Sequence, residues 1–569
     1  FMVADVLGDA SPELLSLVEG DIWIWTINGD QLGQETVLSA GEGIVAFRLA
    51  DYTGDGQLDI AGIIPESSAP VRLWLGGSEQ GKKNIGSQIP FEMPTLREFV
   101  SVELPDEAAA RMAVIEKASK RIVLYEVAKQ AVAETGDREA SLRVQSFTDP
   151  SNRTRQQTVI DTDGDGLQDL VATDTEANAL VIYRQSPGKG MQAGVVYPGL
   201  ADVKAIAAGN VDDDPQAEIF VLSEKEGVVG RSDVTENGEI PFPRPLSLSD
   251  GHTPLALSLV ELNDGPVVAV IGKSSRDYVL DLIGMDGERQ SLELGKLTKA
   301  PEAILAVDAD QDGKVDLLLM TPDRPMIMMH ATDDGFELVD SDSMGQYGLV
   351  KAASSDNTAV TDIDFDGKPE LLVADKNFVR AVRYDSEPEK GVSPGWQVIE
   401  QINARDSTAD LVGIDTLPDN KLLVADKEND RLLVMAAASA DKGPWSDTEA
   451  ISVRNFDFGP IYSGSFAGSG DADVLAVGKS GFAVVRLSGD RYSLKETNVW
   501  RTDEERRMQH ELSVGDVNAD GYTDMVSLDN GEQMLEIFTF TKSGELKYVT
   551  GFQVFESKLF SGGSAREYE

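Results

Sequence analysis

The feature that most constrains the fold is an acidic motif that recurs along the whole chain about every fifty residues. In the fullest copies, acidic residues, or in places Asn or Thr, occupy positions 1, 3, 5 and 9 of this motif, Gly usually occupies position 6, and an apolar residue follows position 9. The copies begin at positions 5, 51, 103, 161, 210, 261, 308, 362, 415, 465 and 516, so successive copies are separated by 46 to 58 residues. Such regular spacing indicates a repeat architecture, in which every unit packs on its neighbours.

Each repeat has the composition of four short strands. An apolar segment such as Ala303–Val307 leads into the acidic loop, and a second one, such as Leu317–Met320 or Leu371–Ala374, leaves it. A third segment often carries an aromatic residue, and a polar fourth one such as Tyr548–Val554 closes the unit. Four strands in about fifty residues make one blade of a β-propeller. The sequence therefore predicts an all-β propeller of about eleven four-stranded blades, with a short helix only at 107–112.

The number of rings and the domain boundaries stay open at this stage. Eleven blades exceed the usual four to eight of one ring, so one large ring, two smaller rings or a ring with missing repeats all fit. The repeats cover residues 1–569, and the longest interval contains the charged stretch Glu134–Glu139, which makes 130–158 the expected place of a boundary or insertion. The tail Ser561–Glu569 stops where another first strand is expected, which leaves open a further repeat beyond residue 569.

The acidic loops are predicted to bind calcium. Alternating carboxylates in a tight loop converge on one point, and Ca²⁺ accepts six to eight hard oxygen ligands. An EF-hand is excluded because it needs an acid at position 12, where the six fullest loops carry Gly62, Ala172, Val221, Leu319, Val373 and Ser527. For any single loop the alternative is a solvated acidic turn, since Asp, Asn and Gly are ordinary turn residues.

Six loops carry the full set of oxygen-bearing side chains. The loop at 5 has Leu7 at position 3 and is assigned no site, and the copies near 103, 261, 415 and 465 are expected to be metal-free turns. The predicted calcium ligands are Asp51, Thr53, Asp55 and Asp59; Asp161, Asp163, Asp165 and Asp169; Asn210, Asp212, Asp214 and Glu218; Asp308, Asp310, Asp312 and Asp316; Asp362, Asp364, Asp366 and Glu370; and Asp516, Asn518, Asp520 and Asp524.

These residues resemble a known family. The pattern Asp-x-Asp-Gly-Asp-Gly-x-x-Asp-Leu at blade spacing is similar to the FG-GAP/VCBS repeats of integrin α-subunit propellers and bacterial surface proteins. The resemblance extends over essentially the whole chain. It implies that the six loops hold Ca²⁺ in the hairpin between the first two strands of a blade. The Phe-Gly and Gly-Ala-Pro elements of the family are mostly absent, with Phe458-Gly-Pro460 as a faint echo, so an integrin-like adhesive function is not implied.

Composition excludes several classes of function. The net charge is −48, from 98 acidic and 50 basic residues, and such a field repels nucleic acids and anionic membranes. The chain has no cysteine and only three histidines, so thiolate metal sites and cysteine nucleophiles are absent. No apolar run reaches the roughly 20 residues of a membrane helix. The sequence starts at Phe1 without an export signal, so we expect any targeting segment to lie outside it.

Three functions fit these observations. The first is a calcium-stabilised binding or scaffold protein without catalysis, located in the periplasm, outside the cell or on its surface, with a protein or glycan as partner. The second is a polysaccharide-degrading enzyme such as a lyase, which would need a basic and aromatic cleft. The third is a non-catalytic subunit of a larger assembly. No Gly-x-Ser-x-Gly, Walker, dinucleotide-binding or His-Glu-x-x-His motif points to an enzyme. Fold alone does not decide among them.

Overall fold

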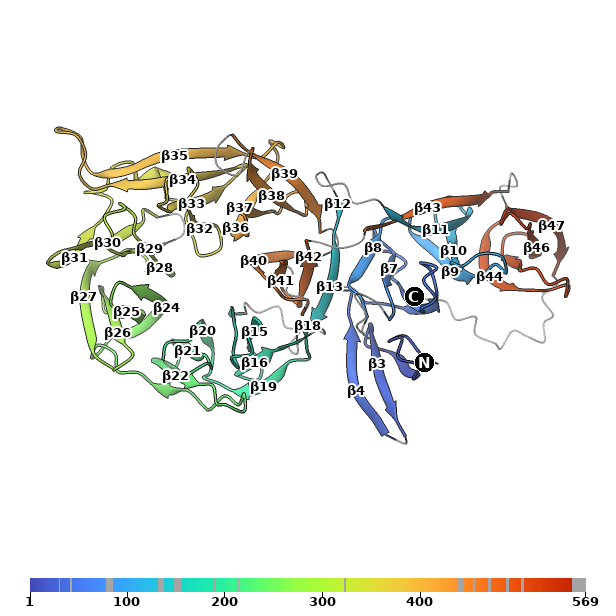
Figure 1. Ribbon diagram of the computed structural model, residues 1–569, viewed down its shortest axis with the longest axis horizontal. Helices are drawn as coiled ribbons and strands as arrows, with labels where there is room; N and C mark the ends of the chain where they lie inside the picture. The colour runs from blue at the N-terminus through green and yellow to red at the C-terminus, as the bar shows by residue number, and fades with distance from the viewer. Residues whose placement is uncertain are drawn as a thin grey trace. The chain divides into compact units, whose positions relative to one another are not determined.

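The computed structural model shows an all-β protein built from four-stranded antiparallel sheets, as the sequence predicts (Figure 1). It describes residues 1–554 except for 30, 41–42, 78–84, 131–137, 148–154, 188–189, 213, 322–323, 439–443, 454–455, 469–471, 488–490 and 503–505. The described residues include one 3-10 turn, η1 (Tyr347–Leu349), and no helix long and apolar enough to cross a membrane. The charged stretch 134–139 and the tail 561–569 lie largely outside the described residues.

The predicted strands are confirmed where the apolar segments are clearest. The segment before the acidic loop at 308 is β28 (Ala303–Val307), the segment after it is β29 (Asp316–Met320), and the polar closing strand of the last repeat is β47 (Leu546–Gln553). The helix predicted at 107–112 is wrong. Its alanines form a turn in which the Ala110 N–H donates to the Asp51 carbonyl, and β10 (Arg111–Glu116) begins directly afterwards. Strand pairing there outweighs the helix propensity of alanine.

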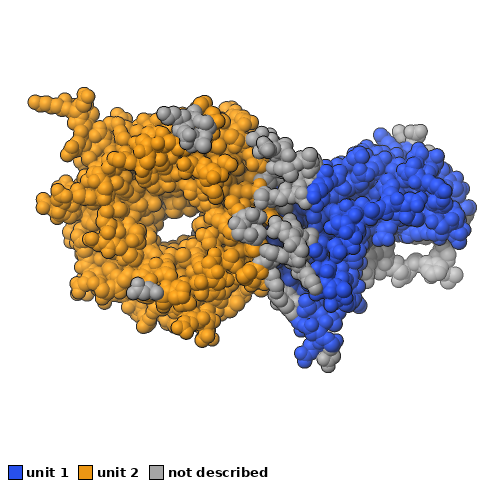
Figure 2. All heavy atoms as spheres, viewed as in Figure 1, with its two compact units in different colours: residues 1–134, 139–145, 488–569 blue, residues 135–138, 146–487 orange. Residues whose placement is uncertain are grey.

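The chain divides into two compact units. The first contains residues 1–134, 139–145 and 488–569, and the second contains residues 135–138 and 146–487 (Figure 2). We call the second unit the ring and the first unit the row, after the way in which their sheets are arranged. The described strands group into eleven blades of three or four strands each, seven in the ring and four in the row.

The ring consists of seven sheets around a central opening, which is visible in the space-filling view (Figure 2). In each sheet the first strand lies innermost and the last lies outermost (Figure 1). The sheets, in chain order, are β14 (Gln157–Ile160), β15 (Asp169–Asp174), β16 (Ala179–Tyr183) and β19 (Val195–Pro198); β20 (Val203–Gly209), β21 (Glu218–Ser223), β22 (Val228–Asp233) and β23 (Arg244–Pro245); β24 (Thr253–Leu262), β25 (Gly265–Ser274), β26 (Asp277–Gly284) and β27 (Arg289–Lys296); β28, β29, β30 (Ile327–Thr332) and β31 (Gly335–Val339); β32 (Thr358–Thr361), β33 (Glu370–Asp375), β34 (Phe378–Asp385) and β35 (Gly395–Asn403); β36 (Leu411–Leu417), β37 (Lys421–Asp426), β38 (Arg431–Ala437) and β39 (Trp445–Ser452); and β40 (Phe458–Gly464), β41 (Asp473–Gly478) and β42 (Gly481–Arg486).

The ring is closed by packing between its last and first sheets. Phe482 on β42 packs edge-on against Tyr183 on β16, with ring centroids 4.9 Å apart, and Phe147 contacts both. Apolar side chains of both sheets form one buried cluster around these three aromatic residues. The remaining neighbours in the ring are joined by similar clusters or, between β36 and β40, by hydrogen bonds such as the one from Ser463 N–H to Asp415.

The row consists of four sheets that pack face to face in sequence. They are β1 (Met2–Ala4), β2 (Glu13–Val18), β3 (Asp21–Asn28) and β4 (Gln31–Leu38); β5 (Ala46–Ala50), β6 (Asp59–Ile63), β7 (Val71–Trp74) and β8 (Gln88–Phe91), with β13 (Ser141–Ser146) beside β8; β9 (Leu96–Val102), β10, β11 (Ile122–Gln130) and β43 (Arg491–Trp500); and β44 (Gln509–Gly515), β45 (Asp524–Asp529), β46 (Met534–Phe540) and β47. Three buried clusters join these four sheets in order.

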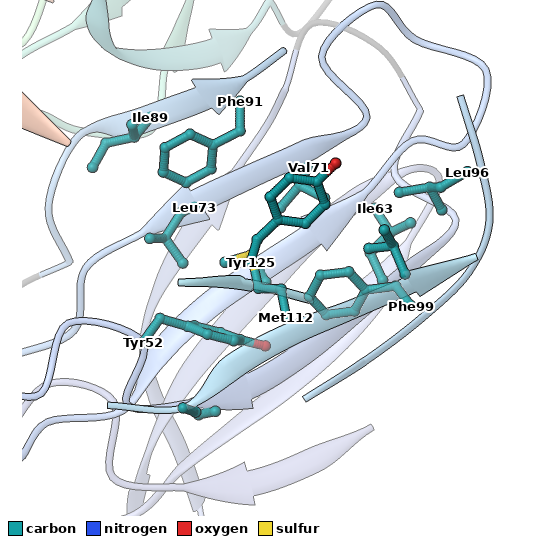
Figure 3. Packing of buried hydrophobic residues seen from close by; sticks show 14 of the residues in the cluster. Tyr52, Ile63, Val71, Leu73, Ile89, Phe91, Leu96, Phe99, Met112 and Tyr125 are labelled. Carbon is teal, nitrogen blue, oxygen red and sulfur yellow. The ribbon is translucent and has the colours of Figure 1, made fainter. Parts of the chain in front are cut away.

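The core between the second and third sheets of the row shows how two blades pack (Figure 3). Tyr52 and Phe99 lie edge to face, with centroids 6.5 Å apart, and Met112 and Tyr125 fill the space beside them. The hydroxyl of Tyr52 lies 2.6 Å from the Ser101 Oγ, so the buried phenol has a hydrogen-bond partner. Burial raises the pKa of Tyr52 above its usual range, so it stays protonated in the core.

The third sheet of the row is interrupted in sequence by the whole ring. Its first three strands end at Gln130, and its fourth strand, β43, begins at Arg491. β11 and β43 nevertheless pair antiparallel from Ile122 opposite Trp500 to Gln130 opposite Arg491. The ring is therefore an insertion between the third and fourth strands of one blade of the row.

Candidate metal sites

Each acidic loop connects the innermost strand of a sheet to the second strand. Asp308 follows β28 directly and Asp316 begins β29, and the loops at 161, 210 and 362 occupy the same place in their own sheets. Because neighbouring ring sheets repeat the same strand order around the opening, these four loops lie at the same edge of the ring. Two further predicted loops, at 51 and 516, belong to the row.

The first carboxylate organises the turn. In the loop at 161, Asp161 Oδ1 accepts hydrogen bonds from the N–H groups of Gly164 (2.8 Å) and Asp165 (3.2 Å), and its Oδ2 accepts one from Gly166 (2.8 Å). Asp51, Asp308, Asp362 and Asp516 accept the same kind of bonds in their loops.

Positions 4 and 6 of the turn lie in the left-handed region. Gly164 has φ 77° and Gly166 has φ 86°. Glycine adopts this conformation without a Cβ penalty. At position 4 the loops at 308, 362 and 516 place Gln311, Phe365 and Ala519 at φ 59–62°, a conformation that costs free energy for residues with a side chain. The loop geometry is therefore maintained even where its sequence is unfavourable.

The ninth residue of the motif is buried and fixes the start of the loop through a hydrogen bond. Asp59, Asp169, Glu218, Asp316, Glu370 and Asp524 are each at most 2% exposed. In every case one carboxylate oxygen accepts the N–H of loop position 2, at distances from 2.9 to 3.1 Å. The ninth acid thus has a structural role as well as being a candidate ligand.

Four of the six predicted loops bring three carboxylates together within 4.8 Å of one another. In the loops at 161, 308 and 362 the three come from positions 1, 3 and 9, whereas the loop at 210 gathers positions 3, 5 and 9. The gathered residues are Asp161, Asp163 and Asp169; Asp212, Asp214 and Glu218; Asp308, Asp310 and Asp316; and Asp362, Asp364 and Glu370. These oxygen clusters are able to hold a metal ion.

The other predicted ligands are not in such triads. At position 5, Asp165, Asp312 and Asp366 each accept the N–H two residues ahead, as Asp165 does from Leu167 at 2.8 Å. Asn210 donates its side-chain N–H to the Asp214 carbonyl. Among the described residues, no triad of acids forms in the loops with Thr53 or Asn518 at position 3, namely Asp51, Asp55 and Asp59, and Asp516, Asp520 and Asp524.

Several of these oxygens are buried without a hydrogen-bond partner. They are the Thr53 Oγ1, the Asp163 Oδ1 and the Asp524 Oδ1. A buried oxygen that makes no hydrogen bond costs free energy, and a cation beside it would remove that cost. The donor set of the loops at 161, 362 and 516 consists of oxygen atoms, which suits a hard cation such as Ca²⁺. The residues therefore fit the predicted ion, while the assignment of each as a calcium ligand stays a prediction.

The raised pKa values of the ninth acids also favour a cation in these loops. Burial, together with a smaller contribution from neighbouring loop carboxylates, raises the pKa of Asp59 to about 7 and that of Asp169 to about 6. Burial likewise raises the pKa values of Glu218, Asp316 and Glu370. Near neutral pH the charged carboxylates in these loops therefore carry a free-energy cost that a bound cation would offset.

The sequence did not reveal that side chains of the third strand reach these loops. Arg184 Nε lies 3.5 Å from Asp163 Oδ2, Arg231 lies 3.4 Å from Asp212 and 3.7 Å from Glu218, and His330 Nδ1 lies 2.9 Å from Asp316 Oδ1. The two arginines reduce the negative charge available to a metal at the loops at 161 and 210, most of all at 210, where Arg231 contacts two carboxylates. Third-strand residues are some fifteen positions away in sequence, so the loop pattern does not include them.

The loop at 5, to which the sequence assigned no site, also gathers three carboxylates. Asp5, Asp9 and Glu13 lie within 4.8 Å of one another. Asp9, at position 5, supplies the third carboxylate, because Leu7 at position 3 has none. In the copies at 103, 261 and 415, the described residues form no such triad; Asp415 instead accepts the N–H of Ser463 at 2.6 Å.

The fold and the loops define a repeat β-propeller protein with candidate cation sites between the first two strands of its blades. Residues 5–62 match the family described as FG-GAP-like repeat, which agrees with the resemblance predicted from the motif. No curated protein sequence matches the chain.

Several solved structures match part of the chain at low similarity. Virginiamycin B lyase from Staphylococcus aureus is 13% identical, with a TM-score of 0.39 over 62% of this chain and 100% of that one. A streptogramin B lyase is 12% identical, with a TM-score of 0.39 over 61% and 98%. YCF48 from Cyanidioschyzon merolae is 11% identical, with a TM-score of 0.36 over 60% and 98%. Similarity at this level carries no information about activity.

Proposed function

We propose that the protein is a calcium-stabilised, extracytoplasmic binding or scaffold protein that presents one face of the ring to a protein or glycan. The observation that supports this function is a cavity of about 670 Å³ at the centre of the ring. All seven ring sheets contribute to its lining. Pockets of this size commonly accommodate a ligand or a side-chain cluster of a partner.

The cavity lies at one end of the central opening, on the face of the ring opposite the acidic loops. Its lining residues precede or begin the innermost strands, as Arg155 does before β14 and Glu302 before β28, or follow the second strands, as Lys427 follows β37. The acidic loops occupy the other ends of these same strands. One face of the ring is thus available for cations and the opposite face for a partner.

The lining combines both signs of charge with apolar side chains such as Leu255 and Phe458. Its cations are Arg155, Lys204, Lys427 and Lys479, and its acids are Glu302, Asp356 and Asp457. In a chain with a net charge of −48, four cations at one place form a local exception. A lyase for acidic polysaccharides would need a predominantly basic cleft with aromatic platforms, whereas this lining has three acids and one aromatic residue, Phe458. This lining therefore favours the binding of a partner with groups of both charges over the cleavage of an acidic polysaccharide.

The proposed extracytoplasmic location rests on the proposed calcium binding. Extracellular modules bind Ca²⁺ with dissociation constants of about 10⁻⁴–10⁻³ M, which is far above the concentration available in the cytosol. We propose that the acidic loops of this chain bind Ca²⁺ with affinities of this weak class. A full-length gene without an export signal would contradict this location.

Binding through the cavity can be tested with a charge-reversed protein. Lys204→Glu with Lys427→Glu would make the lining acidic, and Lys296→Glu on the outer strand β27 serves as the matched control. Wild type, double variant and control are immobilised in 1 mM Ca²⁺ and exposed to surface glycans and secreted proteins of the native organism. We expect a ligand retained by wild type and control and bound at least tenfold more weakly by the double variant. Equal binding to all three, or cleavage of an acidic polysaccharide by the wild type, would contradict the proposal.

A further inference from the structure

The charges that line the cavity of the ring are separated by sign. With the ring sheets numbered in chain order, the sixth, first and second contribute the cations Lys427, Arg155 and Lys204. The fourth and fifth contribute the acids Glu302 and Asp356. Because the ring closes between its seventh and first sheets, the first sheet lies across the central opening from the fourth and fifth (Figure 1). The cavity therefore has a cationic side and an acidic side.

The remaining two ring sheets add no net charge to either side. In the seventh sheet, which belongs to the cationic side, Lys479 lies 3.8 Å from Asp457, and both residues line the cavity. Their charges offset each other. Among the described residues of the third sheet, Leu255 lines the cavity, and it is apolar. The separation of charge therefore rests on the five residues of the sixth, first, second, fourth and fifth sheets.

Residues next to the lining compensate these charges only weakly. Lys204 lies 3.2 Å from Asp202, and Glu302 lies 2.7 Å from Lys299, but all four side chains are about half exposed. Exposed ion pairs of this kind contribute little stability, so each partner can exchange for a charged group of a ligand. Asp356 accepts a hydrogen bond from the uncharged hydroxyl of Ser355 at 3.1 Å.

Arg155 is the cation whose position is best fixed. Its guanidinium donates to the Thr173 carbonyl and lies 4.1 Å from the centre of the Phe147 ring. A guanidinium is planar and presents its donors in a rigid fork that matches a carboxylate, so little side-chain entropy is lost when it binds one. The cationic side is therefore suited to a carboxylate of the ligand.

The lining is less suited to a sugar chain than to a peptide. Phe458, the one aromatic residue of the lining, is 4% exposed and offers no open face for a sugar ring to stack on. A neutral or acidic sugar also carries no cation to pair with Glu302 and Asp356. Peptides supply both signs of charge through their acidic and basic side chains, and a cavity of about 670 Å³ has the size of a ligand site.

We propose that the cavity binds a peptide segment that carries an acidic and a basic side chain a few residues apart. The acidic side chain lies toward Arg155, and the basic one lies toward Glu302 and Asp356. This inference rests on the proposed function, and it selects a protein rather than a glycan as the partner. Complementary charges on both sides fix the direction of the segment, and a segment with one sign of charge leaves one side of the cavity unpaired.

Capped peptides of sequence Glu-(Gly)n-Lys, with n from one to four, are the probes. In an extended chain they separate the two charged residues by about 7 to 17 Å. Calorimetric titration in 1 mM Ca²⁺ should show at least one of them binding at least fivefold more tightly than the same peptide with Gln in place of Glu or of Lys. Added salt, at about 0.5 M, should reduce this preference. No binding of any probe, or equal binding of the singly charged peptides, would overturn the inference.

Two double variants test which side of the cavity binds which charge. Glu302→Gln with Asp356→Asn should abolish the preference over the peptide that lacks Lys. Lys204→Gln with Lys427→Gln should abolish the preference over the peptide that lacks Glu. If the first double variant keeps the preference of the wild type, the acidic side takes no part in binding and the inference fails.

A third double variant is the matched control. Glu337→Gln with Lys296→Gln removes one acid and one cation from the outer strands β31 and β27, and should retain the preference of the wild type. Loss of the preference in this control would mean that the charge of the whole ring, rather than the cavity, selects the peptide, which also overturns the inference. The proposed function is tested separately, by the capture of a natural partner, so either can fail without the other.

Discussion

The ring and the row are built from the same repeat, yet they differ in how much of each sheet is covered. In the ring, second strands such as β15, β21 and β29 are buried at every residue because each sheet lies between two others. In the row only the two middle sheets are in that position. The same local repeat therefore forms blades in both units, and the burial of each second strand depends on whether the described residues place a sheet on one side of it or on both.

The two units also differ in their acidic loops. Of the six loops predicted to bind calcium, four belong to the ring and two to the row. All four ring loops gather three carboxylates, whereas the two row loops do not, although the unpredicted loop at 5 does. If calcium stabilises the blades, it should stabilise the ring more than the row.

Removal of calcium should give the largest effect and the clearest contrast. With a dissociation constant of about 10⁻⁴ M, 1 mM Ca²⁺ stabilises each site by about 1.4 kcal/mol, which gives about 6 kcal/mol for the four ring loops with a triad against about 1.4 kcal/mol for the one row loop with a triad, at 5. Differential scanning calorimetry with excess chelator and with 1 mM Ca²⁺ would show the ring transition moving further than the row transition. A wild type whose transitions do not respond to calcium would leave the loops as acidic turns.

The next largest loss of stability should come from the aromatic contact between the last and first sheets of the ring. Phe482→Ala removes a fully buried ring that packs on Tyr183 and Phe147, which should cost about 3–5 kcal/mol. The loss should appear in the ring transition only. Phe538→Ala, equally buried between the third and fourth sheets of the row, is the matched control and should lower the row transition instead. Movement of both transitions in either variant would show that the two units unfold as one.

Removal of one carboxylate should reduce the calcium-dependent stability in a loop that contains a carboxylate triad, but not in a copy of the motif that lacks one. Asp310 is 2% exposed within its triad, so Asp310→Ala should remove about 1.4 kcal/mol of the calcium-dependent stability. Asp415→Ala should cost about 1 kcal/mol, because it removes the hydrogen bond to Ser463, but with the same loss in chelator as in calcium. Thermal melts of both variants in the two buffers would check this. Equal calcium dependence in both would contradict the assignment of the loop at 308.

The smallest expected effect concerns competition between arginine and calcium. Arg231 contacts Asp212 and Glu218, so Arg231→Gln should strengthen calcium binding at the loop at 210 by a few-fold, or under about 1 kcal/mol. Arg380→Gln, next to Gln401 on the outer strands of the fifth ring sheet, is the control. Calorimetric titration of calcium would detect one site that tightens in the first variant only. Weaker binding would mean that Arg231 orients the carboxylates rather than competing with the ion.

The sequence predicted the blades because apolar strand segments and acidic loops recur at a fixed spacing. It could not predict the insertion, since β43 has the composition of any outer strand and its partner β11 lies far earlier in the chain. It missed the loop at 5 because Leu7 breaks the pattern, although Asp9 supplies the third carboxylate. It also missed Arg184, Arg231 and His330, because strand pairing, not sequence spacing, brings the third strand to the loop.

The insertion of the ring into a blade of the row also fixes an order of events during synthesis. Between Gln130 and Arg491 lie 360 residues, which at about 5–20 residues per second take about 20–70 s to translate. During that time β11 has no strand at its outer edge, and an open edge is a template for pairing with other chains. The ring, whose strands are all made before β43 emerges, is able to fold first, so the nascent chain completes its inner domain before it can finish the blade that carries it.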